Sequence, residues 1–543
     1  MRITPKLLPV VAFAALAAAF ALLCYKLHLD SDRIFFDDLF TSLSHGARWR
    51  DWKMPPAPGY VPDLLFYWMA TWFVHGAAAR LFVVSVAQGL VCALAAIWLG
   101  RTLLRRCSST FYAAILLALA LAVVNSARAG MWLFLNSNNV HVSVSLFGLV
   151  TAALLISRVS SKPVVIGVLL AIVGAVATLS SALYTIAVAV PVLFALGCSL
   201  AFKAVRPSAM SRRGITIFML GIVVGQILAA LLHRVITFHD ALSGRVPLSF
   251  AGARNSLHWL FTDLGALLTR GSQFGKVFAF MIVLSMTYSF VQILVYGKEE
   301  TSNVTIGANM RWSLLFATSS VFFTAAGAVA SGGFVDAYSM RYFAFPFSMF
   351  VVLALVSLDQ AWRPLVLQRV YWISAAVVLT LALSSAGVMR AQARYASLSD
   401  SLRYGSGVPV EQVAIDCIKE LDASGAGLRD GIGGYWFARS IQYVLPTHHM
   451  LQIDDTLHPF FWMMNAGTFN NPSLFPRFYN FAIVKASEDS TAATISTSRL
   501  PVEGRSIHQC RSGGLAIWYY RDDTLQKLMT ANNAWYVASP FYH

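Results

Sequence analysis

The 543-residue chain has few charged residues: Asp, Glu, Lys and Arg make up 12% of it, whereas 57% is hydrophobic. Soluble globular domains carry about 25% charged residues, so this chain does not have the surface of a soluble enzyme. The composition also excludes an intrinsically disordered chain, collagen and a small disulfide-rich secreted module. Repeated apolar runs of about 20 residues instead predict many membrane-spanning helices.

Acidic residues are absent from 64 to 239, and no apolar run has a carboxylate near its midpoint. This absence argues against a carrier that relays protons through buried Asp or Glu residues. Of the 25 acids, six lie in segment 27–77 and thirteen lie from Asp400 onward. Carboxylate chemistry is therefore expected outside the membrane core, above all in segment 27–77.

Cysteine is also scarce, with six in the chain and no CxxC motif. No cluster of His and Cys has zinc spacing, so a structural zinc site is not expected. Four cysteines lie in or beside apolar runs, and only Cys417 and Cys510 fall in the polar C-terminal segment. An even pair in an oxidising compartment favours a disulfide between them, with two unrelated buried thiols as the alternative.

Basic residues outnumber acidic ones by 41 to 25, which gives a formal charge of +16. They gather in short stretches between apolar runs, and placing these stretches in the cytoplasm gives one consistent topology. Because membrane topology explains the charge, nucleic acid is not an expected partner. This topology has about eleven spans, at 7–26, 78–99, 110–125, 140–157, 163–179, 183–202, 214–232, 273–296, 313–330, 345–358 and 370–388.

An odd number of spans with a cytoplasmic N-terminus places the C-terminus on the exterior side of the membrane. The first span lacks a small-x-small cleavage site, so we expect a retained anchor. The predicted fold is thus a polytopic α-helical membrane protein. Residues 1–390 form the transmembrane domain with exterior segments 27–77 and 233–272, and residues 391–543 form a soluble exterior domain.

The C-terminal segment alternates helical and strand patterns. "VPVEQVAIDCIKELDASG" predicts an amphipathic helix that ends at Gly425, and "DTLQKLMTANNAWY" predicts a closing helix. "HMLQID", "NFAIVKA", "SIHQC" and "LAIWYY" predict short strands. The alternation predicts a small α/β domain. "DGIGGYWFARS" lacks the Lys of a phosphate loop, so a tight strand-to-helix turn is the favoured interpretation.

Segment 27–77 carries the most informative acids. Phe35, Phe36 and Leu39 have helical spacing, which predicts an interfacial amphipathic helix over 34–44. Asp37 and Asp38 lie near its beginning. They are either favourable charges at a helix N-terminus or catalytic carboxylates whose partly apolar setting raises their basicity. Spacing alone does not decide between the two.

Four motifs follow one another between Phe35 and Leu104: "FDDLFTSL", "GARWRDW", "VPDLLFYW" and "AAARLFVVSV". In order, spacing and polarity they resemble the GT-C superfamily of membrane glycosyltransferases, in the branch with protein O-mannosyltransferases and the aminoarabinose transferase of lipid A. There an acidic pair begins an amphipathic helix, a G-x-W segment and a K-P-P turn follow, and A-A-R-L opens the next span. This chain is similar to a distant bacterial member, but Val61 and Asp63 replace the Lys and the second Pro of the turn.

The resemblance implies a GT-C-like fold in the bacterial inner membrane, with a cytoplasmic N-terminus and a periplasmic C-terminal domain. The implied reaction transfers a sugar from a polyprenyl-phosphate donor to an envelope acceptor, which is a lipid, a glycan or a protein. Asp37 or Asp38 would be the general base, and Asp37 is preferred because it heads the pair. Asp63 would orient the acceptor or a divalent metal.

The exterior cations are the candidates for binding the leaving phosphate of such a reaction. Arg341 and Tyr342 lie in an "R-Y-x-x-P" segment that is common among these enzymes, and Arg128 follows the end of a span. An arginine that snorkels at the membrane interface is the alternative for each. For the whole chain, the alternatives are a lipid-linked-sugar flippase or transporter and a non-catalytic envelope-assembly protein.

Overall fold

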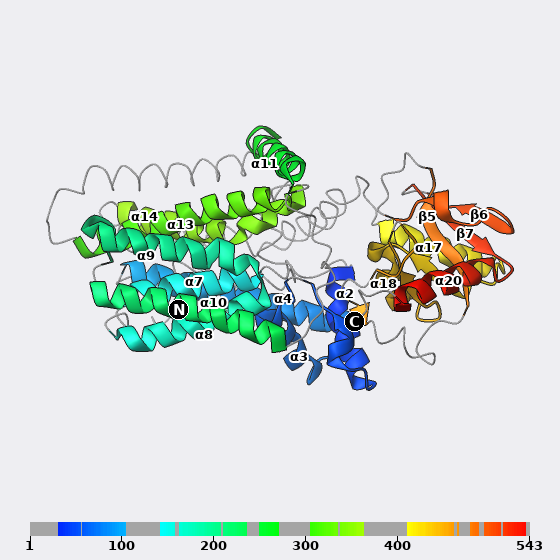
Figure 1. Cartoon of the computed structure of the whole chain (residues 1–543), viewed down its shortest axis with the longest axis horizontal. Helices are drawn as coiled ribbons and strands as arrows, with labels where there is room; N and C mark the ends of the chain where they lie inside the picture. The colour runs from blue at the N-terminus through cyan, green and yellow to red at the C-terminus, as the bar shows by residue number, and fades with distance from the viewer. Residues whose placement is uncertain are drawn as a thin grey trace, which may run out of the picture. The chain divides into compact units, whose positions relative to one another are not determined.

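The computed structural model describes 31–55, 57–104, 142–157, 162–207, 210–235, 249–270, 304–334, 337–362, 410–454, 456–460, 464–465, 478–487, 494–511 and 514–538. These residues form two compact units; Figure 1 labels their longer helices and some of their strands. The first unit takes in the described residues from 57 to 362. The second contains 31–55 together with the described residues from 410 onward.

The first unit is helical. Its α-helices are α3 (Leu65–Thr71), α4 (Ala77–Leu104), α7 (Val142–Ile156), α8 (Pro163–Ser180), α9 (Val190–Ala201), α10 (Arg212–Val235), α11 (Phe250–Arg270), α13 (Val304–Ala330) and α14 (Ala344–Trp362). Shorter helical turns are η2 (Tyr60–Leu64), η4 (Thr185–Ala189), η5 (Lys203–Val205) and η7 (Ala337–Phe343).

Within the described residues, four helical segments are long and apolar enough to cross a membrane: Ala79–Leu103, Pro163–Ser180, Arg212–Val235 and Gly307–Ala330. Shorter apolar helices cover Val142–Ile156, Thr185–Ala201 and Arg341–Leu353. Each therefore overlaps a span expected from the sequence. The expected spans 7–26, 110–125, 273–296 and 370–388 lie outside the described residues, so the total of about eleven stays a prediction.

Small residues allow α8 and α10 to pack closely. A Cβ atom on Gly225 would lie 2.7 Å from the carbonyl oxygen of Ala171, and one on Gly221 would overlap the backbone of Gly167. Near this contact, Gln226 of α10 accepts a hydrogen bond from Thr185 at 2.7 Å. Close backbone approach and interhelical hydrogen bonds are typical of helices packed in a membrane.

The second unit contains a five-stranded sheet in the order β3-β2-β5-β7-β6. Its strands are β2 (Asp430–Gly433), β3 (Met450–Gln452), β5 (Tyr479–Lys485), β6 (Arg505–Gln509) and β7 (Leu515–Tyr520). β2 runs parallel to β3 and β5, while β7 is antiparallel to β5 and β6. Mixed sheets of this kind are common in α/β domains.

Helices α17 (Val410–Ala423), α18 (Tyr435–Val444) and α20 (Thr524–Ala538) accompany this sheet. Phe481 and Ile483 of β5 share a core with residues of α17 and α18, whereas Ala482 and Val484 share a second core with residues of α20. This alternation follows the two-residue period of a strand. The predicted α/β fold is confirmed, as are the helices and strands expected from the patterns between Val408 and the closing helix.

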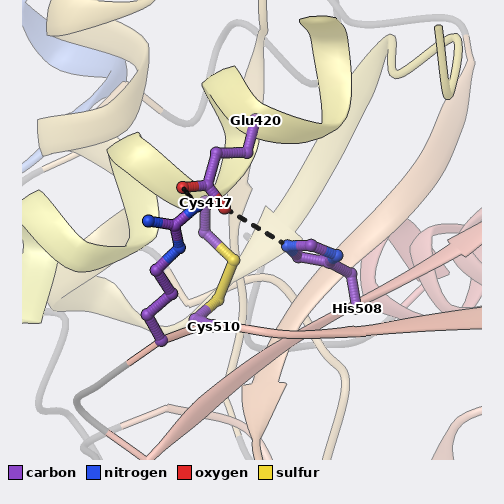
Figure 2. Close-up of a disulfide and its surroundings, with 5 residues drawn as sticks. Cys417, Glu420, His508 and Cys510 are labelled. Atoms are coloured by element: carbon purple, nitrogen blue, oxygen red, sulfur yellow. Dashed lines mark ion pairs between the residues drawn. A yellow bond between two sulfur atoms is a disulfide. The ribbon is translucent and has the colours of Figure 1, made fainter. Parts of the chain in front are cut away.

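A disulfide joins Cys417 of α17 to Cys510, which follows β6 (Figure 2). The two Cα atoms lie 5.6 Å apart, within the normal range for such a bond. Beside it, Glu420 contacts Arg511 at 3.1 Å and His508 at 3.7 Å. The pair expected from the cysteine distribution is therefore bonded in the structure.

Candidate functional site

The acidic pair lies on helix α2 (Ser31–Ser44), which belongs to the second unit. The predicted helix is confirmed, and it begins three residues earlier than expected. Asp37 and Asp38 therefore lie beyond its first turn, where the helix dipole has little effect. The interpretation of the pair as favourable charges at a helix N-terminus loses its basis.

The apolar side of α2 is covered by protein. Ile34, Phe35 and Leu39 are each 0% exposed, and α2 packs against α18. After α2, strand β1 (Trp52–Lys53) pairs with β4 (Met464–Asn465) of the C-terminal segment. Part of the apolar stripe therefore packs against protein, while Phe40 and Leu43 stay partly exposed, and the interfacial position of the helix stays a prediction.

Asp38 forms an ion pair with Arg439 of α18. The Nε atom of Arg439 lies 2.7 Å from Oδ2 of Asp38, and the arginine side chain is only 7% exposed. Its guanidinium also lies 5.9 Å from the centre of the Phe35 ring. A buried guanidinium needs an anionic partner, so this contact fixes the acidic pair to α18.

The surroundings raise the pKa of Asp38 to about 6. Loss of water around the carboxylate is the largest cause; the attraction of Arg439 offsets part of it, and repulsion from Asp37 adds to it. Because 38% of the Asp38 side chain still meets solvent, the loss of water is incomplete. At neutral pH the carboxylate is ionised and paired.

Asp63 lies in the first unit, in η2, immediately before α3. Its side chain is 1% exposed, and its Oδ1 atom accepts a hydrogen bond from the side-chain amide of Gln88 in α4. Its Oδ2 atom and the Oε1 atom of Gln88 have no hydrogen-bond partner among the described residues. Burial is the main reason that the pKa of Asp63 rises to about 8, so the group is mostly protonated at neutral pH.

The turn that carries Asp63 is fixed to the end of α8. The amide of Gly59 donates to the Ser180 carbonyl at 2.8 Å, and the amide of Val61 donates to the Ser180 hydroxyl at 3.0 Å. Gly59 has φ +64°, and a Cβ atom there would lie 2.8 Å from Oδ2 of Asp63. Glycine is required at this position for both reasons. The stiff turn and short aromatic helix predicted from "PPAPGYVPDLLFYW" are confirmed as η2 and α3.

Arg341 and Tyr342 also lie in the first unit, in η7, just before α14. The guanidinium of Arg341 lies 5.5 Å from the centre of the Tyr342 ring. Tyr342 packs against the cluster that contains Leu260, Phe334 and Phe343. The structure therefore places a half-buried cation at the beginning of an apolar helix. Arg128 lies outside the described residues.

The candidate residues thus form separate groups: Asp37 and Asp38 with Arg439, Asp63 with Gln88, and Arg341 with Tyr342. Arg439 and Gln88 were not expected from the sequence. Arg439 is the single charged residue of the "YWFARSIQYV" helix, a signal that could have marked it as a buried ion-pair partner. Among the described residues, no group of three His, Cys, Asp or Glu side chains is placed to hold a metal ion.

Comparison with protein-family models gave no match, and comparison with curated proteins gave none either. The resemblance to GT-C glycosyltransferases therefore depends on the four motifs between Phe35 and Leu104. The function is therefore inferred from the geometry of the acids in these motifs.

Proposed function

We propose that the protein is a GT-C-type glycosyltransferase that moves a sugar from a polyprenyl-phosphate donor to an acceptor of the bacterial envelope. The acceptor is a lipid, a glycan or a protein on the periplasmic side of the inner membrane. Four candidate membrane helices support a membrane protein. The observation that carries the proposal is the acidic pair, which is held on a helix fixed to protein by Arg439 and by the β1–β4 pairing.

In this reaction the acceptor hydroxyl attacks the anomeric carbon of the donor sugar. The bond between that carbon and the phosphate oxygen breaks, and the polyprenyl phosphate leaves with the bonding electrons. A carboxylate takes the hydroxyl proton as a general base. Asp37 is the preferred candidate, because it heads the acidic pair. Arg341, together with Arg128, would bind the leaving phosphate through charge-assisted hydrogen bonds.

The direct test is sugar transfer by the purified protein in lipid nanodiscs. A radiolabelled pool of polyprenyl-phosphate sugars serves as donor, and envelope glycolipids serve as acceptors. Wild-type protein should transfer label, and Asp37→Asn should not. Asp51→Asn is the matched control, because Asp51 is an acid of the same exterior segment outside α2. Absence of transfer by the wild-type protein would count against the proposal.

A second candidate is a lipid-linked-sugar transporter, and Asp63 is the observation that favours it. No apolar run contains a central acid, yet the structure places Asp63 in a buried position against Gln88 of α4. Buried carboxyl groups beside membrane helices are typical of proton-coupled transport. Transport of a lipid-linked sugar across vesicles that depends on a proton gradient, without transfer, would favour this function over the enzyme.

A further inference from the structure

The C-terminal domain contributes one charged side chain to the acidic pair, and that side chain is almost fully buried. Arg439 is separated from Asp38 by about 400 residues of sequence, but the two are joined by an ion pair of 2.7 Å. A carboxylate taken from water into protein costs free energy unless a positive charge faces it. Arg439 supplies that charge.

We infer that Arg439 is a positioning residue: it offsets the charge of Asp38 so that helix α2, and with it the neighbouring base Asp37, stays docked on α18. The role of Asp37 as a base rests on the proposed function, but the docking of α2 on α18 does not. Apolar contacts of Phe35 and Leu39 hold α2 in place as well. Without Arg439, however, the partly desolvated carboxylate of Asp38, whose side chain is 38% exposed, would lose the positive charge beside it.

Within the described part of the chain, the charged and titratable groups of the elements packed at the pair are as follows. Besides Asp38, helix α2 carries Asp32, Arg33 and Asp37, and the charge of Asp37 raises the pKa of Asp38. From α18, the charge of Arg439 lowers it, and the phenols of Tyr435 and Tyr443 are the other titratable side chains of that helix. Strand β4, which also packs against α2, is Met464–Asn465 and carries no titratable side chain.

Because of this arrangement, the inference predicts that the docking of α2 in an Arg439 variant depends on pH. Arg439→Gln should leave Asp38 with a pKa above its present value of about 6, because the lowering influence is lost. At about pH 7.5 the docked helix must then hold an unpaired carboxylate, and docking weakens. At about pH 5 the carboxyl is neutral, and docking recovers. A side chain that only fills space would give a defect that does not depend on pH.

The test is amide hydrogen exchange of residues 31–44, measured by mass spectrometry on the full-length protein in nanodiscs. At about pH 7.5, exchange in Arg439→Gln should be about 10- to 100-fold faster than in the wild type, the ratio expected for a lost hydrogen bond to a charged group. At about pH 5 the difference should largely vanish. The double variant Asp38→Asn/Arg439→Gln should regain protection at both pH values, because it removes both charges of the ion pair together. Arg505→Gln is the control, since its guanidinium lies over Trp518 at 4.0 Å.

If residues 31–44 of Arg439→Gln exchanged at the wild-type rate at the higher pH, the inference would be overturned. An equal defect at both pH values, or a double variant that stays unprotected, would also overturn it. Failure of the proposed function would look different: the wild-type protein would transfer no sugar, while the exchange results would stand. A double variant that docks and transfers sugar supports Asp37 as the base. One that docks without transfer supports the role of Arg439 and overturns Asp37 in favour of Asp38.

Discussion

The side-chain amide of Gln88, inside a candidate membrane span, donates a hydrogen bond to Asp63, 25 residues earlier in the chain. The contact joins the turn at residues 59–64 to α4, while Ser180 joins the same turn to α8. The turn thereby connects α4 and α8 of the first unit, and its acid, Asp63, is almost fully buried. A buried acid of this kind should make stability depend on pH.

The stability of the wild-type protein should fall between about pH 4 and about pH 8, and we predict that Asp63→Asn removes this fall. The folded pKa of about 8 lies above the ordinary value of 3.8. The stabilisation from the protonated group is thus complete below the ordinary value and is lost as pH rises through about 8. The slope it adds is at most about 1.4 kcal/mol per pH unit. Unfolding midpoints of the protein in detergent, measured across this range, check the prediction.

In the wild type the midpoint should fall over this range, and in Asp63→Asn it should fall less, because asparagine mimics the neutral acid. Asp51→Asn is a suitable control, since it changes an acid outside the buried turn. An unchanged slope in Asp63→Asn would mean that Asp63 is already ionised in the folded protein.

Local pattern predicted much of this structure, but of the long-range contacts described above only the disulfide between Cys417 and Cys510 was expected. Helix α17, strand β5 and the closing helix α20 follow from hydrophobic periodicity, and the turn before α3 follows from its prolines. Periodicity also predicts α2, but not what covers it. An amphipathic stripe looks the same whether it faces a membrane or another helix.

There is a physical reason why the ion pair of Asp38 could not be predicted from the sequence. Its partner is some 400 positions away, and no spacing rule relates the two. Burial of Asp63 was equally hidden, because a carboxylate in a polar, proline-rich turn is usually exposed. Helix α11 (Phe250–Arg270), inside the segment predicted as an exterior loop, was missed as well. Such features depend on which elements pack together, and a single sequence does not state that.

The disulfide yields a second prediction. Cys510→Ser should lower the stability of the C-terminal unit by about 2–4 kcal/mol, because the bond closes a long loop in the unfolded chain. The two cysteines are 93 residues apart. Unfolding in denaturant, followed by tryptophan fluorescence, measures the loss. Cys198→Ser is the matched control, since Cys198 is a free, partly buried cysteine. Equal stability of Cys510→Ser and the wild type would contradict the prediction.

A third prediction concerns Arg341. Its guanidinium is half-buried beside Tyr342 at the beginning of an apolar helix. If it binds the donor phosphate, Arg341→Ala should lower kcat/KM for the donor by about 10- to 100-fold through loss of a charge-assisted hydrogen bond. Kinetics at limiting donor measure the effect. Arg234→Ala, at the exposed end of α10, should transfer normally. Full activity of Arg341→Ala would leave the snorkelling interpretation in place.

The last prediction separates the two acids of α2. Asp37→Asn keeps the size of the side chain but cannot take a proton from the acceptor, so transfer should fall by about 10²–10⁴-fold. Its unfolding midpoint should change less than that of Arg439→Gln, because Arg439 is the residue whose side chain is almost fully buried, and it pairs with Asp38 at 2.7 Å. Transfer rates and midpoints measured on the same preparations give both quantities. If Asp38→Asn abolishes transfer while Asp37→Asn retains it, the base is Asp38, and the raised pKa of about 6 then belongs to the catalytic group itself. Normal transfer by both variants would leave neither carboxylate as the base, and the general base would then have to be sought outside α2.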